Sequence, residues 1–332
     1  MPFDLPTRFT DRFGLTVPIA SAPMAGASGG ALASAVSRAG ALGFVGGAYA
    51  DVDWTRRELQ CSDAHAVGCG FITWAIAADA RAFEIALEYQ PRALFFSFGD
   101  PRAFARRALD RGIPVFLQVQ RLAQLSEAVD AGASVIVVQG SEAGGHGTEQ
   151  RTVMTLVPEA RDWLEAHAPS TLLLAAGGIA DGRGLAAALA LGADGALIGT
   201  RFWATEESLA PQAAKQAALA LDGDATCRSA IFDILRRKPW PPEYGFRTHR
   251  NAMHRRWEGR EQALRDAPET AIKAYEAATR EGDYSVAHLP VGQANGLVRN
   301  IPSAADVVTG IAAQAQAILS RLGTPAASQP RL

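Results

Sequence analysis

Short apolar runs alternate with longer amphipathic segments along the first two thirds of the chain. The runs are rich in Val, Ile, Leu and Phe, as expected of buried parallel strands, while the segments between them have a helical period. We predict eight strands, at 19–22, 43–45, 67–71, 94–97, 115–119, 135–138, 172–175 and 196–198. Helices are predicted near 30–39, 54–60, 79–89, 101–111, 122–131, 152–166 and 182–191. Eight strand–helix repeats predict an α/β protein, a (β/α)8 barrel.

Glycine follows the last turn of several predicted helices. Gly40, Gly112, Gly132 and Gly192 all occupy this position, where a left-handed residue ends the helix before the next strand begins. These four glycines are therefore interpreted as structural and are not counted as ligand contacts.

The repeat stops after the eighth strand, and residues 204–302 are more charged and more aromatic. We predict a mostly helical insertion that acts as a substrate or lid domain over a barrel of residues 1–203. A helix at 303–323, with Ser303 as its N-cap, would complete the barrel. Prolines exclude a helix at 238–242, which is predicted to be a rigid surface connection. Which of Trp203, Trp240, Tyr244 and Trp257 reaches the site stays open, because exposed aromatics there are equally suited to a dimer contact.

Composition excludes several classes of function. The 332 residues are 48% hydrophobic and 20% charged, with a net charge of −2 and only short basic clusters, so neither nucleic-acid binding nor a membrane span is expected. Cys61, Cys69 and Cys227 are isolated from one another, which argues against a disulfide framework or a metal site. We expect a cytoplasmic monomer or homodimer that acts on a small molecule.

Glycines follow both of the last two predicted strands. Gly177 and Gly178 come after the seventh strand, and Gly199 and Thr200 after the eighth, where a (β/α)8 barrel commonly holds phosphate. Backbone N–H groups there can approach an anion without a Cβ in the way. We expect this cradle to hold the phosphate of FMN, with Thr200 both contacting phosphate and capping a helix. Asp181 is expected to be an N-cap rather than a ligand.

A histidine among glycines follows the sixth strand. His146 ends the sequence Glu142-Ala143-Gly144-Gly145-His146, which falls on the face of the barrel where active sites lie. We expect His146 to act as a general base or as a hydrogen-bond partner of the substrate, and residues 142–145 to contact the cofactor. The remaining histidines lack such a context: His65, His167, His249, His254 and His288.

Two further strands carry candidate contacts to a flat ring. Ala22, Pro23 and Met24 end the first strand with a fixed backbone and little bulk, although Met24 is equally suited to plugging the barrel. Gln118 is polar within an apolar strand and needs a partner, and Gln120 lies on the same face.

These residues resemble the nitronate monooxygenase family, formerly called 2-nitropropane dioxygenases. The segments that carry the resemblance are 18–47, 137–147, 174–208 and 291–303. The resemblance implies an FMN-binding TIM barrel with a helical domain over the active site. It further implies that His146 is the active-site histidine, that Gly177, Gly178, Gly199 and Thr200 hold the phosphate, and that residues 97–99 are on the substrate side.

One position departs from the family pattern. Many members carry an asparagine near the flavin at the third strand, whereas this chain has Gly70. Gly70 would leave space beside the ring or let its backbone contact it, so a shifted substrate preference is expected while flavin binding is retained.

The reaction implied is oxidation of alkyl nitronates, and of nitroalkanes if His146 removes the α-proton, by FMN and dioxygen to carbonyl compounds and nitrite, with no metal. Motifs alone do not separate this activity from NAD(P)H-dependent flavin reductases of quinones or enoyl thioesters. A flavin-binding sensor without turnover and a flavin-free phosphosugar barrel are less favoured alternatives.

Overall fold

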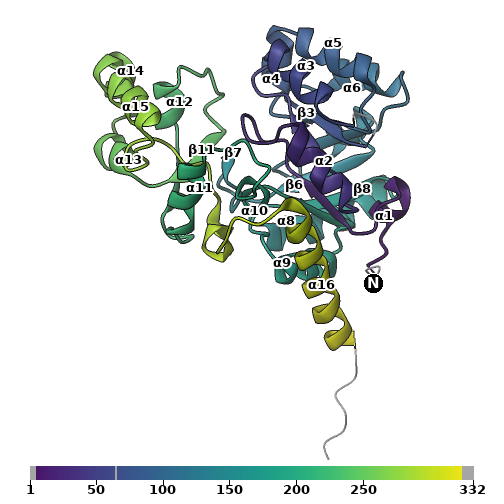
Figure 1. The fold of residues 1–332 in the computed structure, drawn as a ribbon. Coiled ribbons are helices and arrows are strands. Elements are labelled where there is room, and N and C mark those ends of the chain that lie inside the picture. The colour runs from purple at the N-terminus through teal and green to yellow at the C-terminus, as the bar shows by residue number, and fades with distance from the viewer. Residues whose placement is uncertain (1–4, 64–65, 324–332) are drawn as a thin grey trace, which may run out of the picture.

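Eight parallel strands form a nearly closed barrel in the computed structural model, which describes residues 5–63 and 66–323 (Figure 1). The order β1-β9-β8-β6-β5-β4-β3-β2 places each strand beside its expected neighbour. A bridge from Ala20 to Leu42 joins β1 to the segment leading into β2. The predicted barrel is confirmed, with strands β1 (Ile19–Ser21), β2 (Phe44–Gly46), β3 (Gly68–Ile72), β4 (Leu94–Ser97), β5 (Val115–Val119), β6 (Val135–Gln139), β8 (Leu172–Ala176) and β9 (Gly195–Ile198).

Helices between the strands surround the barrel. They are α2 (Gly30–Arg38), α3 (Val52–Gln60), α4 (Thr73–Ala78), α5 (Arg81–Tyr89), α6 (Arg102–Leu109), α7 (Gln124–Asp130), α8 (Val153–His167) and α9 (Gly182–Ala190). Helix α4 was not predicted and directly follows β3. The last helix, α16 (Ala304–Gly323), packs against α9 and α2. The four predicted helix-ending glycines have φ of 91°, 72°, 88° and 96°, which confirms their left-handed conformation: Gly40, Gly112, Gly132 and Gly192.

Aromatic side chains close the end of the barrel where the strands begin. Helix α1 (Arg8–Phe13) places the Phe9 and Phe13 rings 6.2 and 5.4 Å from the ring of Phe116 in β5. Phe44 lies 5.1 Å from the same ring, and all four side chains are buried. The sequence pattern did not predict α1, because it is short and precedes the first strand.

Residues between the eighth strand and α16 form helices and part of a second sheet. The helices are α10 (Thr200–Trp203), α11 (Gln212–Leu219), α12 (Ile231–Leu235), α13 (Ala252–Trp257), α14 (Glu261–Asp266), α15 (Glu269–Glu281) and the 3-10 helix η1 (Gln293–Leu297). Two strands, β10 (Thr226–Ser229) and β11 (Gly245–His249), were not predicted.

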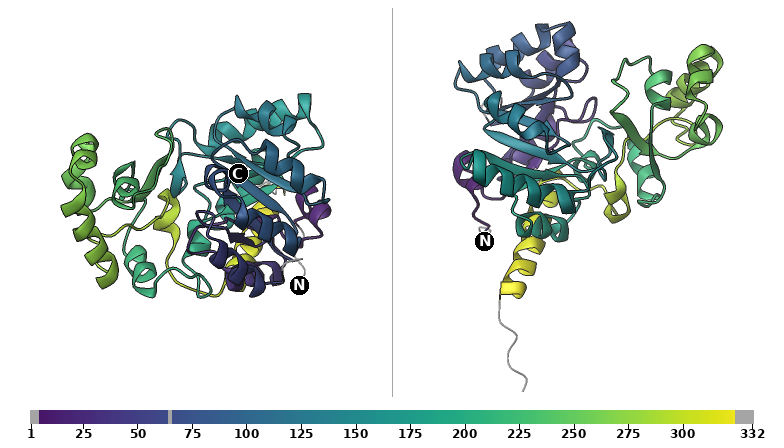
Figure 2. Two further views of the ribbon diagram at one scale, coloured as in Figure 1. Left: turned by 90° about the horizontal axis from the view of Figure 1, so that it is seen from above. Right: turned by 180° about the vertical axis from the view of Figure 1, so that it is seen from behind.

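The second sheet joins this segment to the active-site loop. Strand β11 pairs antiparallel with both β10 and β7 (Gly145–Gly147), and Phe246 lies opposite His146. Figure 1 shows β7 and β11 side by side, and both views in Figure 2 place the segment's helices beside the barrel. The histidine loop therefore forms β7, an edge strand of a sheet whose other two strands, β10 and β11, come from the segment after the eighth barrel strand. Within residues 5–63 and 66–323, no helix combines the length and apolar character needed to cross a membrane.

Candidate active site

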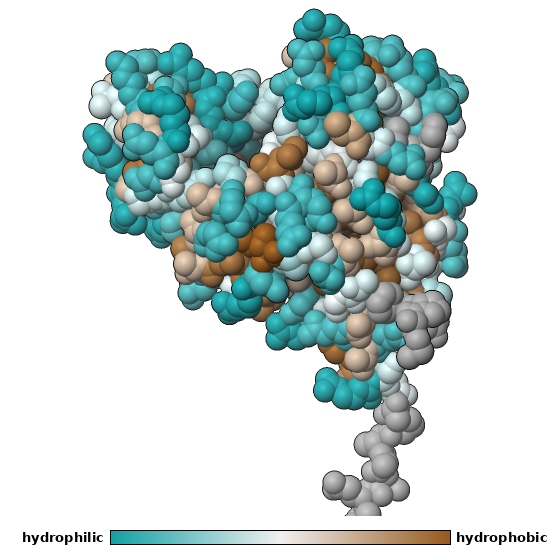
Figure 3. Space-filling view, viewed as in Figure 1, coloured by the Kyte–Doolittle hydropathy of each residue, from teal (hydrophilic) through white to brown (hydrophobic). Residues whose placement is uncertain are grey.

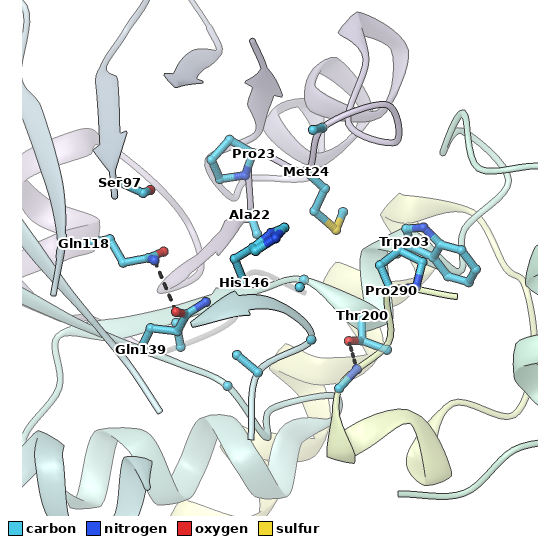
Figure 4. A pocket seen from close by; sticks show the side chains of 18 of the residues that line it. Ala22, Pro23, Met24, Ser97, Gln118, Gln139, His146, Thr200, Trp203 and Pro290 are labelled. Carbon is cyan, nitrogen blue, oxygen red and sulfur yellow. Dashed lines mark hydrogen bonds between the residues drawn. The ribbon is translucent and has the colours of Figure 1, made fainter. Parts of the chain in front are cut away.

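A cavity lies at the carboxyl ends of the barrel strands, between the barrel and the 204–302 segment. The space-filling view shows the surface hollowed between these two parts (Figure 3). All the site residues predicted from the sequence line this one cavity: Ala22, Pro23, Met24, Gly70, Gln118, Glu142, Ala143, Gly144, Gly145, His146, Gly177, Gly178, Gly199 and Thr200. Several of them surround the cavity in Figure 4.

Glycines form one end of the cavity. Gly177 and Gly178 have φ of 106° and 73°, a backbone that L side chains rarely adopt. A Cβ on Gly199 would lie 3.7 Å from Ala22 Cβ and 3.8 Å from Met24 Sδ, two atoms of the cavity wall. The missing side chain of Gly199 therefore leaves room inside the cavity, as an anion cradle requires.

Thr200 is the first residue of α10 and lies beside these glycines. Its hydroxyl Oγ1 accepts a hydrogen bond from the N–H of Gly292 at 3.1 Å (Figure 4). The residue that caps α10 is Gly199, with no side-chain hydrogen bond, so the capping prediction for Thr200 was wrong. Thr200 instead fixes the 290–294 loop against the cavity.

The 290–294 loop meets the histidine loop at two glycines. A Cβ on Gly144 would lie 2.5 Å from the N of Gly292, and a Cβ on Gly292 would lie 2.6 Å from the N of Gly144. Real Cβ atoms do not approach this closely, so both positions require glycine. The site glycine at 292 was not singled out from the sequence.

Glu142 lines the cavity, but its side chain is committed to a helix. The carboxylate oxygens accept the N–H of Val153, at the start of α8, at 3.0 and 3.2 Å. Its carbonyl oxygen accepts the N–H of Gln293. Asp181 caps α9 as predicted, accepting the N–H groups of Arg183 and Gly184.

Glutamines from neighbouring strands form a small network at the barrel mouth. Gln118 and Gln120 in β5 both donate through Nε2 to Oε1 of Gln139 in β6, at 3.2 and 2.5 Å. Gln118 and Gln139 line the cavity, whereas Gln120 does not. The predicted shared face is correct, and Gln139 is the partner that the sequence did not identify.

The space beside Gly70 is filled by a neighbour. A Cβ built on Gly70 would overlap the Cβ and Cγ of Pro23 and lie 3.3 Å from Phe95 Cβ. The expectation that Gly70 leaves space on its side-chain side was therefore wrong. Pro23 packs where an asparagine side chain would begin, so the two positions are linked.

His146 is held between two aromatic rings. Its ring centroid is 3.4 Å from that of Trp240 and 4.4 Å from that of Phe246, and the three rings are nearly parallel. Nε2 lies 2.9 and 3.1 Å from the two carboxylate oxygens of Asp233 in α12. Burial lowers the pKa of His146 below its ordinary value of 6.5, and Asp233 offsets only part of that effect. The imidazole is therefore neutral near pH 7 and rigidly placed.

Two of the four aromatic residues that the sequence left as candidates reach the site. Trp203 and Trp240 line the cavity, whereas Tyr244 and Trp257 are not among its lining residues. The segment 238–242 is not helical, as predicted, but it is more than a surface connection, because it carries the ring that stacks on His146. Trp240 Nε1 also donates to the Tyr49 hydroxyl at 3.1 Å.

The segment contributes charged and polar groups that the sequence analysis missed. Arg236, the residue directly after α12, lines the cavity and donates to the Tyr49 hydroxyl at 3.1 Å. His288 also lines it and meets the Tyr275 hydroxyl at 2.8 Å, although its sequence context gave no indication of this place. Burial lowers the pKa of His288 to about 3, which keeps it neutral. Arg236 and His288 reach the cavity through contacts between segments distant in the sequence, so no local motif could predict their positions. Of the other dismissed histidines, His65 lies outside the described residues.

Two arginines, of which Arg247 is buried and Arg228 is partly buried, hold the histidine loop in place. Arg228 donates to the carbonyl oxygens of Gly145 and Ala143 at 2.9 Å each, and Arg247 donates to that of Ser141 at 3.2 Å. Burial lowers the pKa of Arg228 to about 9. Among the described residues, no group of three or more His, Cys, Asp or Glu side chains is placed to bind a metal ion.

The sequence profile named nitronate monooxygenase matches residues 7–67 and 68–314. This chain belongs to the nitronate monooxygenase family. The nitronate monooxygenase npaC of Metarhizium robertsii is 34% identical, with 91% of this chain and 92% of that protein covered. A nitronate monooxygenase of Neurospora crassa is 30% identical, with coverages of 92% and 90%. The family is one of oxidoreductases, as the sequence predicted.

Solved structures place two kinds of enzyme beside this member of the family. FabK from Thermotoga maritima superposes with a TM-score of 0.80 at 28% identity, covering 96% of this chain and 99% of its own. A nitroalkane oxidase from Streptomyces ansochromogenes superposes with a TM-score of 0.77 at 26% identity, covering 93% and 98%. Both likenesses span the barrel and the segment that contributes Asp233 and Trp240.

Proposed function

We propose that this protein catalyses the FMN-dependent oxidation of alkyl nitronates, and of nitroalkanes, by dioxygen to carbonyl compounds and nitrite. The observation that carries the proposal is the cavity itself. A buried neutral histidine faces it from β7, and a side-chain-free glycine cradle lies at the ends of β8 and β9. Relatives named nitronate monooxygenase align over most of the chain.

The residues present fit an FMN. Gly199 leaves room for a phosphate group, as its Cβ position indicates, and Gly177 and Gly178 have a left-handed backbone that would let their N–H groups approach it. Ala22, Pro23 and Met24 would face the flavin ring from β1, and Gln118 offers a polar group to its edge. When bound, the flavin supplies the acceptor for electrons from the substrate. Enzymes of this family depend on flavin in general. We choose FMN because the glycine cradle is suited to its phosphate group.

His146 would bind the substrate beside the ring. A nitronate is already an anion, so His146 need only orient it and donate or accept a hydrogen bond. A neutral nitroalkane must first lose its α-proton, which requires a neutral imidazole. The direction of the His146 pKa shift supplies that form near pH 7.

We assign the 204–302 segment as the domain that shapes the substrate end. Arg236, Trp240, Phe246 and His288 all reach the cavity from it. Aromatic rings and buried backbone there exclude water from the reacting atoms. A cytoplasmic location and a monomeric or homodimeric state remain predictions from the sequence.

An NAD(P)H-dependent flavin reductase is the second candidate, because the sequence motifs alone do not separate it from a nitronate monooxygenase. The test measures oxygen uptake, nitrite and carbonyl product together when the yellow protein is given ethyl nitronate. Formation of both products in parallel with oxygen uptake supports the proposal. Oxygen uptake that requires NADH or NADPH, with no nitrite from ethyl nitronate, would move the assignment to the reductase.

A further inference from the structure

We propose that Asp233 is a positioning residue that holds His146 in the tautomer protonated at Nε2, so that Nδ1 is the atom that takes the proton from a neutral nitroalkane. The proposal rests on the function proposed above. It adds an assignment of atoms and a residue from the 204–302 segment to the proton transfer.

The contact between the two side chains is short and shielded. Nε2 of His146 lies 2.9 Å from Oδ1 and 3.1 Å from Oδ2 of Asp233, and the two side chains are 7% and 6% exposed. Parallel rings of Trp240 and Phe246 cover both faces of the imidazole. Rotation of the ring would break both the stacking and the hydrogen bond, so the ring nitrogens keep their assignments.

The chemistry of the partner decides which nitrogen carries the proton. An ionised carboxylate only accepts hydrogen bonds, so Nε2 must donate in this pair. In the neutral imidazole the other nitrogen, Nδ1, then keeps its lone pair. Nδ1 is therefore the ring nitrogen that remains free to take a proton from a substrate.

Two positively charged side chains, Arg236 and Arg228, lie near the pair of His146 and Asp233. Nη1 of Arg236, the residue that caps the end of α12, lies 3.9 Å from Oδ1 of Asp233. Arg228 from β10 opposes protonation of His146, and the neighbouring His288 is neutral. Asp233 is the acidic group that contacts the imidazole, and it can stabilise the imidazolium formed when Nδ1 accepts a proton.

The proton transfer itself balances without a further reactant. The Cα–H bond of the nitroalkane breaks, its proton bonds to Nδ1, and the electron pair forms the C=N bond of the nitronate. Ethyl nitronate already lacks this proton. The ratio of activities on nitroethane and ethyl nitronate therefore isolates the step that Asp233 controls.

The decisive variant is Asp233→Asn in the flavin-loaded protein. The new amide can donate to Nε2, which favours the tautomer protonated on Nδ1 and blocks the base. We expect kcat/KM for nitroethane to fall by about 10²-fold or more, with that for ethyl nitronate within about threefold of wild type. Asp110→Asn, which removes an exposed carboxylate paired with Arg106, is the matched control and should change neither value.

The outcomes separate two failures. Equal losses on both substrates would assign Asp233 a purely structural role, and an unchanged ratio would overturn the proposal. If wild-type protein fails to oxidise ethyl nitronate, the proposed function fails instead. Asp233→Glu restores a carboxylate and should recover part of the nitroethane activity.

A measurement on wild-type protein keeps the proposal testable if the variant does not fold. ¹⁵N NMR of histidine-labelled protein distinguishes the two nitrogens, and the spectrum of His146→Asn identifies the resonances of His146. We expect Nε2 to be protonated and Nδ1 unprotonated near pH 7.5. The reverse pattern would overturn the tautomer assignment whatever the kinetics show.

Discussion

The two ends of the barrel differ in how many of their buried polar groups have hydrogen-bond partners, although both have residues with a left-handed backbone. At the end where strands begin, Asp194 accepts hydrogen bonds from Arg8, from Arg161 and from the N–H of Leu173, all at 2.7–2.8 Å. At the other end, Phe98 has a left-handed backbone with φ of 62° and Ala48 has φ of 49°, while at the end where strands begin Gln90 has φ of 48°.

Some buried side-chain atoms at the cavity end lack a hydrogen-bond partner. Among the described residues, buried side-chain atoms without a hydrogen-bond partner include Oε1 of Gln120 and Nη1 of Arg236, both near the barrel mouth. Strained backbone and unpaired buried groups reduce stability, and they concentrate at functional sites. We infer that contacts at the closed end contribute more to the free energy of unfolding than contacts at the cavity end. Substitutions at the two ends should therefore change different measured quantities.

The largest effect is expected at the cavity end, from His146→Ala. Removal of the imidazole should lower kcat/KM for nitroethane by about 10²- to 10⁴-fold, the usual contribution of a general base. The free energy of unfolding should also decrease, because the change leaves the buried carboxylate of Asp233 without its hydrogen-bond partner, so the kinetics are compared on protein shown to be folded. Steady-state kinetics with flavin content measured in parallel check this. A loss of nitroethane activity explained wholly by lost flavin would contradict the role of His146 as base.

At the closed end, Asp194→Ala should act on stability. It leaves the buried guanidinium of Arg161 and the N–H of Leu173 without their partner, and breaking such a buried pair costs about 3–5 kcal/mol. Urea unfolding measures the loss, with Asp110→Ala as an exposed control that should change stability by less than about 1 kcal/mol. Folded Asp194→Ala should keep wild-type KM values. A specific loss of substrate affinity would break the proposed division between the ends.

Gly199→Val tests whether the glycine cradle at the cavity end binds FMN. The new side chain would enter the space between Ala22 and Met24, and the backbone at this position has φ of −102°, outside the left-handed region that favours glycine. We expect the Kd for FMN to rise about tenfold to a hundredfold with little change in apoprotein stability. Fluorescence titration with FMN measures this change. Gly310→Ala in α16, where a Cβ meets no atom within 4 Å, is the control. An unchanged Kd for FMN would exclude Gly199 from the cradle.

The smallest effect is a local sensitivity to acid. Burial lowers the pKa of His249, of His254 to about 4 and of His288 to about 3, so these groups bind protons in the unfolded state at a higher pH than in the folded state. Stability should therefore be fully present above pH 6.5 and fall as the pH decreases below that value. Between pH 6.5 and 5 most carboxylates stay ionised. Hydrogen exchange at pH 7 and pH 5 should show the loss within 204–302, and an equal loss at the closed end would contradict this.

Much of the fold was predictable because it depends on local patterns. Buried parallel strands have continuous apolar runs, and Gly40 and Gly192 mark helix ends for a local steric reason. Loops at the ends of parallel strands meet at one edge of the barrel, which is why Gly70, Gln118, His146 and Gly199 reached one cavity. Their common location followed once the strands were counted correctly.

The remainder depends on contacts between distant segments. Strands β10 and β11 are short, and β11 is partnered by β7, almost a hundred residues earlier in the chain. No local periodicity predicts that pairing. Asp233 reaches His146 only because this sheet and α12 bring them together, so its contribution to the site was not visible in the sequence. Pro23 likewise determines the space at Gly70 through packing alone.

The central claim is that a nitronate, rather than a nicotinamide nucleotide, delivers electrons to the flavin in this cavity. The direct test is anaerobic: purified yellow protein is mixed separately with propionate 3-nitronate, NADH and NADPH while flavin absorbance is followed. We expect rapid loss of oxidised flavin absorbance with the nitronate and no change with either nucleotide. Reduction by a nucleotide, with no response to the nitronate, would contradict the account.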